Sequence, residues 1–128
     1  MTKFKQGDFV IVNFDPSVGQ EIRKRRPGLV VSSDKYNMVS NLIIVAPITS
    51  SVKNIPTRFN VVGYEKVYGQ VNTLQPIPMD SVKREAKLVG HMNDYDLYQV
   101  LQLIGANFDL TLWTKKVTTS TFDRVVIT

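Results

Sequence analysis

The sequence predicts a mainly β protein that ends in one helix. Several short runs rich in Val and Ile, bounded by Gly, Pro, Asp or Asn, are typical of β-strands. Near the C-terminus the apolar spacing changes to three and four residues, which is typical of an amphipathic helix. Many short strands followed by one long helix favour a compact, curled sheet with the helix packed across it.

The predicted strands cover, in chain order, residues 9–12, 29–32, 42–48, 57–62, 70–74 and 86–89. The first three are nearly continuous Val and Ile runs that are shorter than typical helices. The fourth alternates, with Phe59 and Val61 on one face, as a half-buried strand does. Pro76 and Pro78 are expected to break the chain between the fifth and sixth strands.

The predicted helix follows from four apolar residues at spacings of four, three and four, namely Leu97, Leu101, Ile104 and Phe108. These positions share one face of an α-helix. Asn93 or Asp94 is a suitable N-cap. Gly105 is expected to destabilise this helix by about 1 kcal/mol relative to Ala.

Composition narrows the class of protein. The chain has 128 residues, 43% of them hydrophobic and 21% charged, so we expect one globular domain. It has neither an apolar run of the roughly 20 residues that a membrane span needs nor a signal-like apolar core at its start, so we expect a cytoplasmic protein with no membrane partner. With no cysteine and only His91, thiolate chemistry, a histidine-based zinc site and a two-histidine mechanism are excluded, and we expect no metal or cofactor. The net charge of +5 favours a polyanionic partner, either nucleic acid or an acidic protein.

A basic loop and a pair of hydroxyls stand out. Four consecutive cations, Arg23, Lys24, Arg25 and Arg26, end against Pro27, and Thr49 and Ser50 directly follow the third predicted strand. Cations beside hydroxyl donors suit a phosphate backbone. The alternatives are a solvated loop and, for Thr49, a hydroxyl that bonds its own backbone.

The order and spacing of seven short matches resemble the MazF/PemK (Kid) toxins of bacterial type II toxin–antitoxin systems. The matches are Gly7-Asp8, Asp15-Pro16, Val18-Gly19, Glu21, Arg26-Pro27, Tyr36-Asn37 and Pro47-Ile48-Thr49-Ser50. The resemblance implies an SH3-like barrel of the type shared with CcdB toxins, with residues 1–108 as the toxin domain and 109–128 as an extension of unknown role. It also implies a homodimer, a MazE/PemI-like antitoxin, and DNA binding together with that antitoxin.

The activity that the resemblance implies is that of an endoribonuclease, an mRNA interferase that cuts single-stranded RNA without a metal. The 2′-hydroxyl of RNA would attack the phosphate and leave a 2′,3′-cyclic phosphate and a 5′-hydroxyl. Arg26 and Thr49 match the family's catalytic residues. Because a guanidinium keeps its charge, Arg26 suits transition-state electrostatics better than proton transfer, with Thr49 donating to the phosphate. The group that moves the protons is left open.

Further residues receive supporting roles. The residues expected to bind RNA are Glu21, Arg23, Lys24, Arg25, Ser50 and Gln75. Asn37 is expected to be structural, and His91 to be a surface or capping residue. The chain departs from the family pattern in having Asn72, Leu74 and Ile77 where relatives carry an arginine, an acidic and a basic residue. A PemK-style Arg/Asp mechanism is therefore unsupported, and cleavage would rest on Arg26 and Thr49.

Two other functions remain open from the sequence. One is a catalytically weak or inactive CcdB-like barrel that acts by binding a protein target, which the changes at Leu74 and Ile77 favour. The other is a basic RNA-binding module without cleavage, for which the sequence offers no evident aromatic stacking platform on the strands. The intact pair of Arg26 and Thr49 favours the nuclease.

Overall fold

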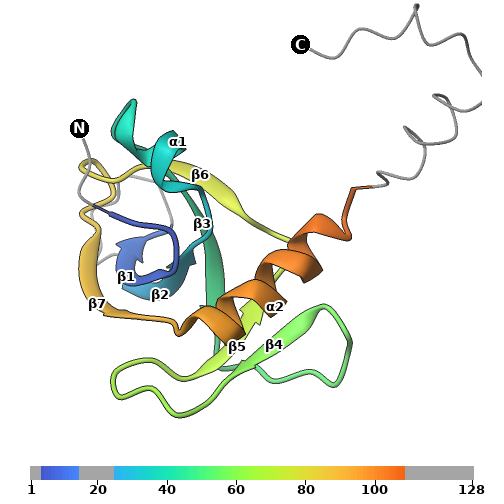
Figure 1. The fold of residues 1–128 in the computed structure, drawn as a ribbon. Helices are drawn as coiled ribbons and strands as arrows, with labels where there is room; N and C mark the ends of the chain where they lie inside the picture. The colour runs from blue at the N-terminus through green and yellow to red at the C-terminus, as the bar shows by residue number, and fades with distance from the viewer. Residues whose placement is uncertain (1–3, 15–24, 109–128) are drawn as a thin grey trace, which may run out of the picture.

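The computed structural model describes residues 4–14 and 25–108 (Figure 1). The elements of this part are, in chain order, β1 (Asp8–Asn13), β2 (Arg25–Val30), α1 (Asp34–Met38), β3 (Leu42–Thr49), β4 (Arg58–Val61), β5 (Gly69–Asn72), β6 (Ile77–Asp80), β7 (Lys87–His91) and α2 (Asp94–Gly105). The prediction of a mainly β fold with a C-terminal helix is confirmed. No helix in residues 4–14 and 25–108 is long and apolar enough to cross a membrane.

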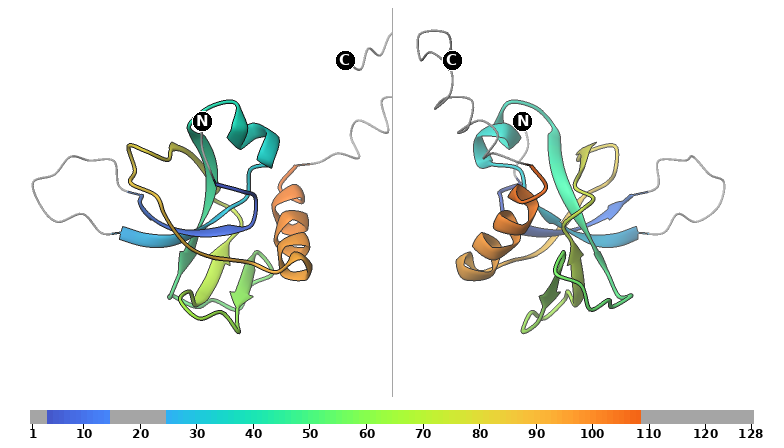
Figure 2. Two further views of the ribbon diagram at one scale, coloured as in Figure 1. Left: turned by 60° about the vertical axis from the view of Figure 1, so that its left-hand side comes forward. Right: turned by 90° about the vertical axis from the view of Figure 1, so that its right-hand side faces the viewer.

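Strand β3 is the axis of the sheet. The strand order is β4-β5-β3-β2-β1-β7, every pairing is antiparallel, and β6 also pairs with β3. The first half of β3 pairs with β6, from Leu42 to Val45, and its end pairs with β5 at Ile48 and Thr49. The sheet therefore curls around β3 into a half-barrel, and α2 lies along one side of it (Figures 1 and 2).

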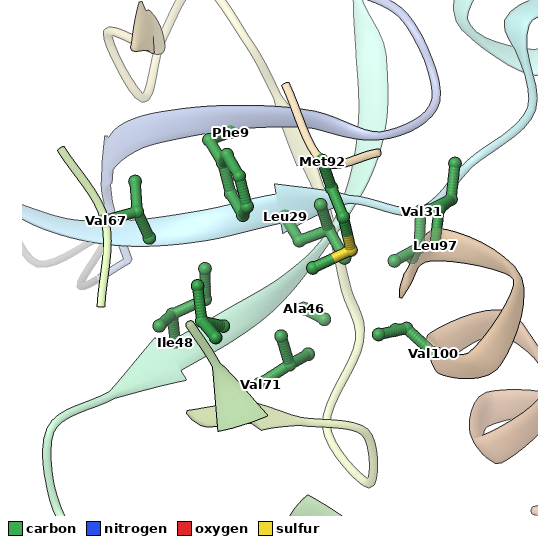
Figure 3. Close-up of a cluster of buried hydrophobic side chains, with 11 residues drawn as sticks. Phe9, Leu29, Val31, Ala46, Ile48, Val67, Val71, Met92, Leu97 and Val100 are labelled. Carbon is green, nitrogen blue, oxygen red and sulfur yellow. The ribbon is translucent and has the colours of Figure 1, made fainter. Parts of the chain in front are cut away.

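The central strands are buried on both faces, which explains their continuous Val and Ile runs. One face carries Phe9, Leu29 and Ala46, which pack with Met92 and the helix residues Leu97 and Val100 (Figure 3). The other face carries the neighbours of these residues along the strands, with Phe4, Val10, Val12, Val30, Ile43, Val45 and Met79 in one cluster. Successive side chains of a strand point to opposite faces, so β1, β2 and β3 each contribute to both clusters.

The prediction that Pro76 and Pro78 break the chain between two strands was wrong for Pro78, because β6 contains this residue. Pro78 lies opposite Ile44 of β3. The carbonyl of Ile44 accepts from Val31 N at 2.8 Å, and its N–H donates to Ser32 Oγ at 2.9 Å, so both groups point away from β6. A proline at this position loses no ladder hydrogen bond, and the strand forms.

Strand β2 begins earlier than predicted, at Arg25 rather than at residue 29, so the end of the basic run is strand and not loop. Its pairing with β1 extends from Leu29 to Arg25, whereas its pairing with β3 begins at Gly28. Pro27 thus has a ladder partner on one side only, and its missing N–H is tolerated there.

The two helices differ in how well the sequence predicted them. Helix α1 was not predicted; Ser33 caps it by accepting from Tyr36 N at 3.1 Å. Asn93 caps α2 as expected, accepting from Asp96 N at 2.8 Å. The expectation for Phe108 was wrong, because α2 ends at Gly105 and Phe108 lies beyond it, 65% exposed.

Candidate active site

The strand register brings the two predicted catalytic residues together. β2 pairs with β3 at Gly28 with Pro47 and at Leu29 with Ala46. Arg26 lies two residues before Gly28 and Thr49 two residues after Pro47, so both lie just beyond the last pair of this ladder. The pairing of β2 with β3 thus brings residues that are distant in sequence to the same end of the two strands, where both line one hollow.

A surface hollow of about 390 Å³ lies at this place. Its lining residues come from three parts of the chain: Ile11, Arg26 and Pro27 from β1 and β2, Ile48, Thr49 and Ser50 from the end of β3, and Lys66, Val67 and Tyr68 from the segment before β5. Two cations and two aliphatic hydroxyls therefore share one open hollow. Such a set can hold a phosphate through charge-assisted hydrogen bonds.

The hydroxyl of Thr49 is held in place and keeps its proton for a ligand. Its Oγ1 accepts from Ser51 N at 3.0 Å, which is the backbone contact expected if the residue only ended its strand. A hydroxyl has one donor and two acceptor positions, so accepting this bond leaves the O–H free to donate. The contact therefore fixes the oxygen without removing its ability to bind a phosphate oxygen.

Gln70 fixes the segment that follows Ser50 at the edge of the hollow. It is the ladder partner of Thr49 and is 4% exposed. Its Oε1 accepts from Lys53 N at 2.9 Å and from Arg58 Nη1 at 3.3 Å. Its Nε2 donates to Lys53 O at 3.1 Å and to Asn60 Oδ1 at 2.9 Å. All four hydrogen-bonding positions of the amide are used, so the segment after Ser50 is tied to the β4–β5 pair.

Gly69 allows the strand that carries Gln70 to approach Thr49. Its φ is +118°, and a Cβ at this position would lie well inside van der Waals contact of the Thr49 carbonyl oxygen. Glycine is the residue that accepts both conditions at little cost. The backbone contact thus fixes where Thr49 and Tyr68, the residue before Gly69, lie relative to each other.

Arg25 and Gln75, the two other predicted site residues in the described part of the chain, do not line this hollow. Arg25 donates through Nη2 to Glu85 O at 2.7 Å and to Ile11 O at 3.1 Å, which ties it to the backbone. Gln75 is exposed and accepts from Asn72 Nδ2 at 3.1 Å. RNA-binding roles for these two residues stay predictions. Glu21, Arg23 and Lys24 lie outside the described residues.

Two of the remaining expectations concern local structure. Asn37 is buried, accepts from Ser32 Oγ and donates to Phe4 O at 3.2 Å, which is a structural role. His91 does not cap α2; it ends β7, and its Nδ1 lies 2.8 Å from Asp8 Oδ1 with half of the side chain exposed. Among residues 4–14 and 25–108, no three His, Asp or Glu side chains cluster closely enough to hold a metal ion.

A second and larger hollow, of about 690 Å³, offers no comparable chemistry. It lies between α2 and the sheet and is lined mainly by apolar residues: Val31, Ile44, Leu74, Pro76, Pro78, Leu101, Ile104, Asn107 and Phe108. None of these side chains ionises. The chemistry of the described part therefore points to the smaller hollow at Arg26 and Thr49.

Sequence reasoning missed Lys66, Tyr68 and Gln70. Lys66 and Tyr68 precede β5, whose pairing with the end of β3 brings them to the hollow. The sequence offered one signal, the Tyr68-Gly69 pair directly before a predicted strand, because such a glycine often marks a close backbone approach.

The fold is that of solved MazF proteins. The chain superimposes on MazF from Deinococcus radiodurans with a TM-score of 0.71 and 30% identity, over 80% of this chain and 94% of that one. It is also similar to a MazE-MazF structure from the same organism, with a TM-score of 0.69 and 27% identity, over 80% of this chain and 92% of that one.

The family model of the PemK-like, MazF-like toxins of type II toxin–antitoxin systems matches residues 5–108, and the chain belongs to this family. It is 33% identical over 60 residues to the endoribonuclease toxin MazF of Escherichia coli K12. That match spans 47% of this chain and 54% of the E. coli toxin, about half of its length.

Proposed function

We propose that the protein is an endoribonuclease toxin that cuts single-stranded RNA by attack of the RNA's own 2′-hydroxyl, without a metal. The observation that carries this proposal is the hollow that Arg26 and Thr49 line together. RNA contains its own nucleophile, so an enzyme needs only to orient it, stabilise charge and assist proton transfer. A relative of this chain carries the name endoribonuclease toxin, which agrees with the proposal.

In the proposed reaction the 2′-oxygen forms a bond to phosphorus and the bond from phosphorus to the 5′-oxygen breaks. The 2′-hydroxyl gives up its proton and the departing 5′-oxygen gains one, which leaves a 2′,3′-cyclic phosphate and a 5′-hydroxyl. Arg26 would stabilise the negative charge on the non-bridging oxygens. Thr49 would donate its hydroxyl hydrogen to the same group, and Ser50 lies next to it as a further donor.

The test is cleavage of a long single-stranded RNA in the presence of EDTA. We expect the unchanged protein to cut, and Arg26→Ala and Thr49→Val each to lower kcat by about 10²-fold or more, the scale of losing one preorganised donor. Thr49→Ser keeps the hydroxyl and should keep most of the activity. Lys35→Ala removes an exposed cation of α1 and serves as the charge-matched control. Full activity of Arg26→Ala or Thr49→Val in a folded protein would overturn the assignment.

The partners are proposed on the same basis. We expect a homodimer in the cytoplasm that is inhibited by a MazE/PemI-like antitoxin with an acidic segment. Support comes from the similar MazE-MazF structure and from the net charge of +5. If the acidic segment occupies the Arg26 hollow, it must compete with RNA and its affinity must fall as salt is added. Simultaneous binding of both partners to Arg26→Ala would contradict this mode of inhibition.

A further inference from the structure

The lining of the hollow includes one exposed aromatic ring. Tyr68 is 75% exposed and lines the same hollow as Arg26, Thr49 and Lys66. We propose that Tyr68 forms a nucleobase subsite, on which one base beside the cut phosphate stacks. This inference rests on the proposed function and deepens it, because it names how the substrate is gripped.

The backbone beneath the ring is fixed. Val67, directly before Tyr68, is 3% exposed and belongs to the core cluster under α2. Gly69, directly after it, lies against the Thr49 carbonyl. The chain is therefore anchored on both sides of Tyr68 while its side chain faces solvent. A ring presented this way loses little conformational entropy when a base stacks on it.

The chemistry of the hollow matches one nucleotide unit. A nucleotide is an anion joined to an aromatic ring, and the hollow places two cations, Arg26 and Lys66, and two hydroxyls beside one exposed aromatic ring. Aromatic side chains bind single-stranded RNA by stacking on its unpaired bases. A volume of about 390 Å³ is within the range of small-ligand pockets.

The molecule contains a matched control for this residue. Tyr95 of α2 is 76% exposed, nearly the same as Tyr68, and does not line the hollow. Exposure alone therefore does not distinguish the two tyrosines. What distinguishes Tyr68 is its position beside Arg26 and Thr49.

The experiment pairs protein variants with RNAs that each lack one base. Cut sites are first mapped with unchanged protein; short RNAs spanning one site are then made, each with a single abasic nucleotide. We expect one abasic position to weaken binding to Arg26→Ala protein about 5- to 150-fold, the fold-change that corresponds to one base stacking on an aromatic side chain. In the same Arg26→Ala protein, Tyr68→Ala should weaken binding of the intact RNA by the same factor. The abasic nucleotide at that position should then cause no further loss of affinity.

Three further variants separate stacking from charge and from general damage. Tyr68→Phe should bind like unchanged protein, because the ring is retained, and Tyr95→Ala should have no effect. Tyr68→Ala should raise KM with kcat nearly unchanged and leave the salt dependence of binding unaltered. Lys66→Ala should instead lower the slope of log affinity against log salt by about 0.7, the change for one lost phosphate contact on a single strand.

The outcomes are distinguishable. If RNA is bound and cut but every abasic position affects Tyr68→Ala and unchanged protein equally, the subsite is wrong while the proposed function stands. If Tyr68→Phe is as weak as Tyr68→Ala, the ring is not the binding element and the subsite is also wrong. If the protein neither binds nor cuts RNA, the proposed function fails and the subsite with it.

Discussion

Replacing Gly69 by alanine tests whether the backbone contact between β5 and Thr49 positions the site. The substitution has two costs. A side chain at a φ of +118° is strained, which costs on the order of 1–3 kcal/mol. In addition, the new Cβ would lie closer than 3.0 Å to the Thr49 carbonyl oxygen, a separation that real Cβ atoms essentially never show. Ordinary contact begins at 3.4 Å, so the backbones of Thr49 and residue 69 must move apart by several tenths of an ångström at least.

Gly63 provides the matched control. Its φ is +89°, also in the glycine-favouring region, but a Cβ there would meet nothing within 4 Å. Gly63→Ala therefore carries the strain without the displacement. We expect both variants to lose stability in urea unfolding, and only Gly69→Ala to lose kcat in RNA cleavage, about 10- to 100-fold, because a misplacement of about 1 Å can cost 10²-fold. Equal kcat values for the two folded variants would refute the idea that this contact positions Thr49.

Three further predictions concern single side chains. Gln70→Ala should lower the free energy of unfolding by about 1–3 kcal/mol and lower kcat, because a fully bonded buried amide is lost; an unchanged urea midpoint would contradict this. Tyr64 donates to Asp96 Oδ2 at 2.7 Å, and burial followed by this bond raises the pKa of Tyr64 above 10.0. Its contribution to stability is therefore present below pH 10 and lost as pH rises through the folded-state pKa, so Tyr64→Phe should be destabilised below pH 10, and its deficit relative to unchanged protein should shrink above it. Backbone N–H donation from Lys83 lowers the pKa of Asp80 below 3.8, so its contribution is present above that pH and lost in stronger acid. Asp80→Asn should accordingly flatten the acid limb of stability against pH, and an unchanged limb would count against it.

Most of the correct predictions rest on patterns among residues that are close in sequence. The β-branched runs, the helical spacing and the Asn93 cap each depend on residues within a few positions of one another, and the structure has the corresponding elements. The combination of Arg26 and Thr49 as catalytic residues is what the family resemblance implies. In the structure both residues line the hollow beyond the end of the β2–β3 ladder, and neither residue alone indicates where the other lies.

What the sequence did not predict depends on contacts between distant segments. Pro78 is tolerated in β6 because Ile44 directs its hydrogen bonds to the other side, which no local pattern reveals. Tyr68 reaches the hollow only because β5 pairs with the end of β3. Arg25 was grouped with Arg26 because they are adjacent in sequence, yet Arg25 is bonded to the Glu85 and Ile11 carbonyls and does not line the hollow.

The most direct test of the central claim is the effect of removing one oxygen from the RNA. A substrate with a mapped cut site is prepared with a single 2′-deoxynucleotide on the 5′ side of the cut and is incubated with the protein in EDTA. If the 2′-hydroxyl is the nucleophile, cutting at that site stops while other sites are cut at the usual rate, and the products end in a 2′,3′-cyclic phosphate and a 5′-hydroxyl. Continued cutting at the deoxy-substituted site, or products with a 5′-phosphate, would contradict the account.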